Sequence, residues 1–103
     1  MNRPAAWTDE ELRLLTTVYA CMLHHEAQGT DYTKSAHNKW LQKRIDRTGP
    51  AIEFKFANLS AALEDAGNSY IPGYKPRRNR QGDLDRFVSQ GIDTFTPNAC
   101  VVE

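Results

Sequence analysis

The sequence predicts a mainly α-helical fold, in which a three-helix core with a helix-turn-helix is followed by a basic wing-like loop and a closing fourth helix. Apolar residues recur at intervals of three and four in three stretches, which is the period of an amphipathic helix. Capping residues and glycines bound these stretches at positions typical of helix ends. The 103 residues suit one domain with one core, in which 1–6 and 92–103 are expected to be peripheral.

The first helix is predicted to begin at Thr8. The Thr8 hydroxyl can cap the free amides of the first turn, and Glu11 three residues on completes a capping box. One apolar stripe follows, formed by Leu12, Leu15, Tyr19 and Met22. Gly29 is predicted to end the helix, and Trp7 is expected to pack back onto the stripe as a hydrophobic staple.

The next two helices form the predicted helix-turn-helix. The first of them is expected over about 33–45, and its face opposite the core carries Lys39, Lys43 and Arg44. Residues 46–49 form the turn, and Pro50 fits the first position of the following helix, which Gly67 ends. The core stripe of that helix is Ile52, Phe56, Leu59 and Leu63.

Residues 68–81 are predicted to form the wing-like loop. Two prolines and a glycine in this stretch exclude a long helix or a regular central strand. Ile71, between two tyrosines, suggests a short extended piece turning at Pro72 and Gly73, so a two-stranded hairpin and an ordered loop both stay open. A short closing helix is predicted over about 83–90.

The net charge is zero, but the charges are strongly segregated along the chain. Residues 34–63 carry six cations against two anions, which gives +4, and residues 66–82 carry four cations and no anion, which also gives +4. Local potential steers a polyanion more than the total charge does. Both segments are therefore candidates for contact with nucleic acid.

Within these segments, the third helix is the predicted reading helix. Asn58 can pair with adenine, and Lys55 can donate to guanine or to a phosphate. Residues before this helix and in the loop are predicted to hold phosphates, because cations, hydroxyls and exposed amides commonly do so. They are Arg47, Thr48, Tyr74, Lys75, Arg77, Arg78 and Arg80.

Blander interpretations stay open for each of these features. Lys55 and Asn58 could form an ordinary solvated helix face, and the basic loop could serve solubility. Phe54 lies away from the core stripe, where packing against the wing or a partner is favoured over stacking on a base.

The cysteines and histidines give no sign of a metal or catalytic site. Cys21 and Cys100 lie far apart, and no spacing typical of zinc ligands occurs, so neither a disulfide nor a cofactor is expected. No histidine has a positioned acid-base partner, and we expect no enzymatic activity. The N-terminus lacks a signal-peptide pattern and no run is long enough to span a bilayer, which predicts a cytoplasmic protein without a membrane partner.

Three motifs in order carry a family resemblance. They comprise Trp7 to Leu12, then Arg47 with Ile52 to Lys55 and Asn58 to Ser60, and then Tyr70 to Pro76. With these motifs the chain resembles the N-terminal domain of bacterial HNH-type, restriction-associated endonucleases, and its first three helices also resemble a Myb-like trihelical unit. The resemblance implies a DNA-targeting module attached to a nuclease. The nuclease motif itself is absent, so we do not expect this chain to cleave DNA.

The sequence thus predicts a non-catalytic DNA-binding module of a restriction system, with duplex DNA as the expected partner. An HNH nuclease domain, in the same or another chain, is a further expected partner. The alternative is a protein-interaction module that docks a nuclease or another subunit through Phe54 and residues 70–74.

Overall fold

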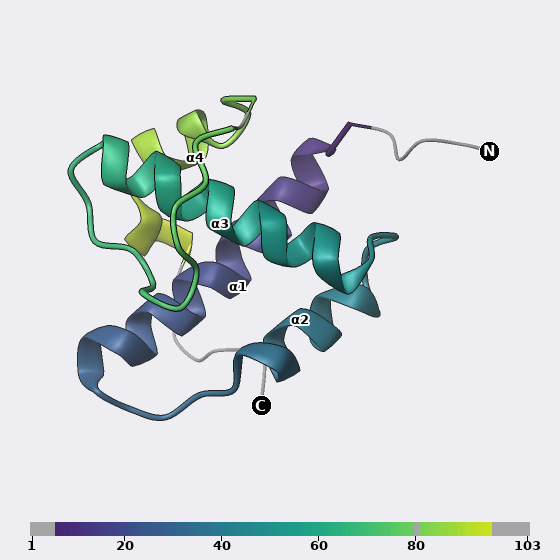
Figure 1. Cartoon of the computed structure of the whole chain (residues 1–103), viewed down its shortest axis with the longest axis horizontal. Coiled ribbons are helices and arrows are strands. Elements are labelled where there is room, and N and C mark those ends of the chain that lie inside the picture. Colours follow the sequence, from purple (N-terminus) through teal and green to yellow (C-terminus); the bar gives the residue numbers. More distant parts are fainter. Residues whose placement is uncertain (1–5, 80, 96–103) are drawn as a thin grey trace.

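The fold is mainly α-helical, as predicted. The computed structural model describes residues 6–79 and 81–95. This part of the chain contains the helices α1 (Asp9–Gln28), α2 (Lys34–Gln42), α3 (Gly49–Asp65) and α4 (Asp85–Ser89), and the 3₁₀ helix η1 (Ile92–Phe95) (Figure 1). It contains no β-strand, so residues 68–79 form an ordered loop and not a hairpin.

The local signals that predicted the long helices act as expected. The Thr8 hydroxyl accepts a hydrogen bond from the Glu11 amide, and the Glu11 carboxylate accepts one from the Thr8 amide, which confirms the capping box. Gly29 ends α1 in the left-handed conformation, with φ of 69°. Pro50 lies in the first turn of α3, and the Thr48 hydroxyl caps that helix.

Two helices are shorter than predicted. The predicted helix over 33–45 ends at Gln42, because the chain tightens there into a turn in which the amides of Arg44 and Ile45 both donate to the Leu41 carbonyl. The closing helix covers Asp85–Ser89 only, and η1 follows it.

The core lies where α1, α2 and α3 meet. Its largest members have no solvent-exposed surface or almost none, and include Leu15 and Tyr19 of α1, Leu41 of α2, and Phe56 and Leu59 of α3. At one end, α4 packs on α3 and η1 packs on α1, and Phe87 and Phe95 close the core with ring centroids 5.8 Å apart. Trp7 packs against the core edge, as predicted.

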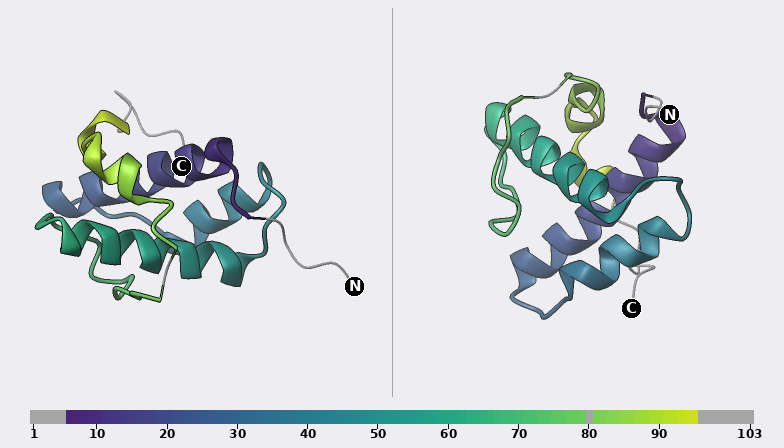
Figure 2. Two further views of the ribbon diagram at one scale, coloured as in Figure 1. Left: turned by 90° about the horizontal axis from the view of Figure 1, so that it is seen from above. Right: turned by 45° about the vertical axis from the view of Figure 1, so that its right-hand side comes forward.

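The loop after α3 extends from the end of that helix and then turns back to pass beside it on the way to α4 (Figure 2). The buried Tyr19 hydroxyl accepts from the Ile71 amide at 2.9 Å, and it also bonds the Ser60 hydroxyl at 2.7 Å. Further along, the Arg77 amide donates to the Ala57 carbonyl at 3.1 Å. These bonds fix the loop to α1 at Ile71 and to α3 at Arg77.

The prediction that the chain forms no disulfide is wrong for Cys21. This residue is buried in α1 and is disulfide-bonded. Cys100, the other cysteine of the sequence, lies outside the described residues. None of the helices described is both long and apolar enough to cross a membrane.

Candidate nucleic-acid interface

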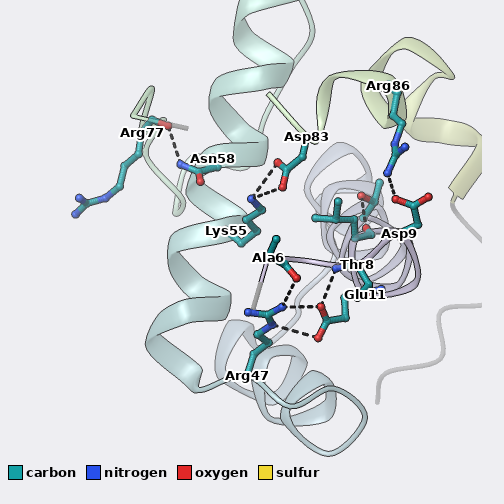
Figure 3. A network of polar contacts seen from close by, with 12 residues as sticks. Ala6, Thr8, Asp9, Glu11, Arg47, Lys55, Asn58, Arg77, Asp83 and Arg86 are labelled. Atoms are coloured by element: carbon teal, nitrogen blue, oxygen red, sulfur yellow. Dashed lines mark hydrogen bonds and ion pairs between the residues drawn. The ribbon is translucent and has the colours of Figure 1, made fainter. Parts of the chain in front are cut away.

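The two predicted reading residues of α3 are buried, so the prediction that they face solvent is wrong. Lys55 is 6% exposed, and its Nζ lies 3.0 and 2.9 Å from the two carboxylate oxygens of Asp83 (Figure 3). Asn58 is 3% exposed, and its amide donates to the Arg77 carbonyl at 2.9 Å. The returning chain covers this side of α3, which leaves neither side chain free to enter a DNA groove.

Arg47, predicted to bind phosphate, is an internal tie between α1 and the turn before α3. Its side chain is 7% exposed and forms a double hydrogen bond with the Glu11 carboxylate, at 3.1 and 2.8 Å (Figure 3). It also donates to the Ala6 carbonyl and lies over the Trp7 ring. The Arg47 guanidinium lowers the pKa of Glu11, because its hydrogen bonds favour the ionised carboxylate. Thr48 is exposed, but its hydroxyl is the cap of α3.

The predicted loop residues that the structure describes separate into three groups. Tyr74 is buried against Phe56, with ring centroids 4.9 Å apart, and burial raises the pKa of its hydroxyl. Arg78 is exposed but pairs with Glu64 and Asp65. Lys75 and Arg77 are exposed and have no carboxylate partner within the described residues. Arg80 lies outside the described residues.

The exposed face of α2 lies outside the predicted site residues. Its lysines and polar side chains follow one another at helical spacing: Lys34, Ser35, Asn38, Lys39, Gln42 and Lys43. No described carboxylate pairs with any of these lysines. The signal was present in the sequence as an uninterrupted polar stripe, but the third helix has the more familiar position of a reading helix.

This face borders two clefts at the start of α3. One, of about 390 Å³, lies between α2 and α3 and is lined by Lys34 and Lys39 among others. The second, of about 380 Å³, lies between α3 and the loop and is lined by Lys75 and Arg77 among others. The clefts adjoin, because three residues line both, namely Pro50, Glu53 and Tyr74. We call the combined surface the basic cleft and define it by its four cations, Lys34, Lys39, Lys75 and Arg77.

The basic cleft is held in shape by bonds between its walls. The Asn38 amide donates to the Gly49 carbonyl at 3.0 Å, which joins α2 to the start of α3. Lys34 Nζ donates to the Gly73 carbonyl at 3.2 Å and lies over the Tyr74 ring, which joins α2 to the loop. The bond from Asn58 fixes the loop backbone at Arg77 (Figure 3), whose guanidinium lies over the ring of Phe54. Asn58 is therefore a positioning residue for Arg77.

The chemical groups in the basic cleft suit binding of an anionic ligand. The cations can attract phosphates, and the amides of Asn38 and Gln42 add neutral donors. In the part of the chain that the structure describes, no group of three or more His, Cys, Asp or Glu side chains is placed to hold a metal ion.

Comparison with known proteins adds no relative. No protein-family model matches the chain, and neither a curated protein nor a solved structure shows significant similarity to it. The resemblance to the N-terminal domain of HNH-type endonucleases thus stays a prediction based on three sequence motifs.

Proposed function

We propose that this chain is a non-catalytic DNA-binding module that contacts the DNA backbone through the basic cleft. One observation carries the proposal. Four exposed cations, contributed by α2 and by the loop after α3, surround one concave surface, and no described carboxylate pairs with them. Glu53 is the one anion among the described residues that line the surface, so its local charge is about +3 despite a neutral chain.

The internal pairing of the other cations favours the same surface. Arg47, Lys55 and Arg78 already bond carboxylates, and DNA would have to break those bonds to use them. The cations of the basic cleft bond no described carboxylate, so a phosphate that binds them displaces counterions without breaking an ion pair, and counterion release is the main source of affinity for DNA. In this proposal α2 and the loop contact the nucleic acid. Hydrogen bonds with α3 hold α2 and the loop in place.

The three sequence motifs resemble a nuclease-associated domain. We therefore propose that this chain, when bound to DNA, brings a restriction-type nuclease to that DNA. The nuclease would be an HNH domain in the same or another chain.

The test is a fluorescence-anisotropy titration of labelled duplex and single-stranded DNA at about 50 and about 200 mM salt. We expect the affinity to fall steeply with salt. The triple variant Lys39→Ala, Lys75→Ala, Arg77→Ala should bind at least about tenfold more weakly and show a salt slope smaller by about 2 to 3. Arg78→Ala is the matched control, because it removes a neighbouring cation that is already paired, and it should change affinity less than about twofold. Absence of binding to either form of DNA at low salt, or affinity that does not depend on salt, would contradict the proposal.

A second function is supported by Phe54, which is 42% exposed and lies beside Arg77. Aromatic and arginine side chains are the commonest anchors of protein interfaces. This chain would then dock a nuclease or another subunit, giving a stable complex in size-exclusion chromatography and no DNA binding at low salt.

A further inference from the structure

Phe54 is the one large hydrophobic side chain that is exposed in the described part of the chain. It lines the cleft of about 380 Å³ together with Arg77, whose guanidinium carbon lies 5.2 Å from the centroid of the Phe54 ring. The Phe54 ring is 42% exposed, so part of it is open to a ligand that enters the cleft. A nucleobase is a flat group that stacks on aromatic rings and on guanidinium planes alike.

Glu53 gives the same cleft a hydrogen-bond acceptor. It is exposed, lines both halves of the basic cleft, and has no hydrogen bond or ion pair with a described residue. A carboxylate among four cations weakens phosphate binding, so a backbone-binding surface alone gives it no role. It would have a role with a base, because carboxylates accept hydrogen bonds from the N–H groups on a base edge. Guanine presents two parallel N–H donors on its Watson–Crick edge, which match the two oxygens of a carboxylate.

We propose that the basic cleft holds an unpaired nucleotide of single-stranded DNA, with guanine preferred. The base stacks on Phe54 beside Arg77, its Watson–Crick edge faces Glu53, and Lys34, Lys39 and Lys75 hold the flanking phosphates. The inference rests on the proposed function, since both place DNA at the basic cleft, but it replaces duplex by single-stranded DNA as the preferred ligand. In a duplex the Watson–Crick edge is already paired and the base faces are stacked, so neither Phe54 nor Glu53 would have a partner.

The surroundings of Phe54 favour a nucleotide over a protein partner. Protein interfaces are depleted of lysine at their centres and present several apolar side chains together. Here the exposed Phe54 ring shares its cleft with Lys75 and Arg77, and no other large apolar side chain among the described residues is exposed beside it. Cations interleaved with an aromatic platform are the usual construction of single-strand binding surfaces.

The test measures affinity for four labelled ligands of equal length: mixed-sequence single-stranded DNA, the same sequence as a duplex, oligothymidine, and oligothymidine with one central guanine. The intact chain should bind the single strand at least about tenfold more tightly than the duplex, and one guanine should improve binding to oligothymidine. Phe54→Ala should weaken single-strand binding about tenfold, since stacking contributes about 1–3 kcal/mol per base, and should leave duplex binding unchanged. Phe54→Trp keeps a stacking surface and should retain the affinity. Glu53→Gln should abolish the preference for guanine and keep or increase the salt-dependent binding to oligothymidine.

Controls separate this inference from the proposed function. Lys39→Ala should weaken single-strand and duplex binding alike, because it removes only a phosphate contact. Equal affinity for the two forms, with no effect of Phe54→Ala and a clear effect of Lys39→Ala, would overturn the inference and leave the proposed function standing. Absence of binding to all four ligands would overturn both. A Phe54→Ala variant whose elution volume changes while its DNA affinity does not would identify Phe54 as a contact between protein chains and would also overturn the inference.

Discussion

Replacing Arg47 by alanine removes the guanidinium that joins the start of α1 to the turn before α3. The side chain is 7% exposed and makes two hydrogen bonds with the Glu11 carboxylate, whose own side chain is 16% exposed. Removing one partner of a buried ion pair costs about 3–5 kcal/mol, because the other charge is left unpaired. Since Glu11 keeps some contact with water, we expect the low end of this range, about 3 kcal/mol.

Urea unfolding monitored by circular dichroism measures this loss directly. Arg78→Ala is the matched control, because it removes an arginine whose carboxylate partners are exposed, and it should lower the free energy of unfolding by less than about 1 kcal/mol. If the two variants lost the same small amount, the internal role of Arg47 would be refuted. Arg47 is not part of the basic cleft. At a temperature where the Arg47→Ala variant is folded, it should therefore bind DNA nearly as tightly as the parent chain.

The ion pair between Arg47 and Glu11 also predicts how the free energy of unfolding depends on pH. The pKa of Glu11 is lowered in the folded protein, mainly by its hydrogen bonds to Arg47, so its contribution to stability is present above the unfolded pKa of 4.5. That contribution should be lost as the pH falls below 4.5 through the lower folded value. In Arg47→Ala this part of the acid dependence should be absent.

Two further predictions concern buried polar groups. Tyr19→Phe removes the acceptor of the Ile71 amide and should lower the free energy of unfolding in urea by about 2 kcal/mol, whereas Ser60→Ala keeps that bond and should cost less; equal losses would contradict the role of the Ile71 bond. Burial lowers the pKa of His37, so the unfolded chain binds more protons than the folded one below pH 6.5. The free energy of unfolding should therefore fall as the pH decreases from 6.5 towards the folded pKa of His37. In His37→Gln, the melting temperature should depend less on pH over this range. An unchanged profile in this variant would show that other groups cause the dependence.

The parts of the fold that depend on local chemistry could be predicted from the sequence. The capping box at Thr8, the left-handed Gly29 and the proline at the start of α3 each act within a few residues, and they gave the limits of α1 and α3 closely. The apolar stripe of α3 likewise identified its core face, since Ile52 and Phe56 have no exposed surface.

The candidate site could be predicted only in part, because burial depends on what covers a helix. A helical projection leaves Lys55 and Asn58 on the outer face, yet Asp83 bonds Lys55 and the Arg77 carbonyl bonds Asn58. Sequence spacing carries no information about a contact 28 residues away. The same reason explains Arg47, whose partner Glu11 lies 36 residues earlier in the chain. Lys75 and Arg77 stay exposed, as expected for a basic loop.

A titration of the ¹⁵N-labelled chain with short single-stranded DNA, followed through its backbone amide resonances, locates the surface that contacts the DNA. If DNA binds in the basic cleft, the largest chemical-shift changes should occur in α2, at residues 73–77 and at the Phe54 amide. These changes should reverse when salt is added. Shifts concentrated on α4 or on the outer face of α1, or no shifts at low salt, would contradict the assignment of the DNA-binding surface to the basic cleft.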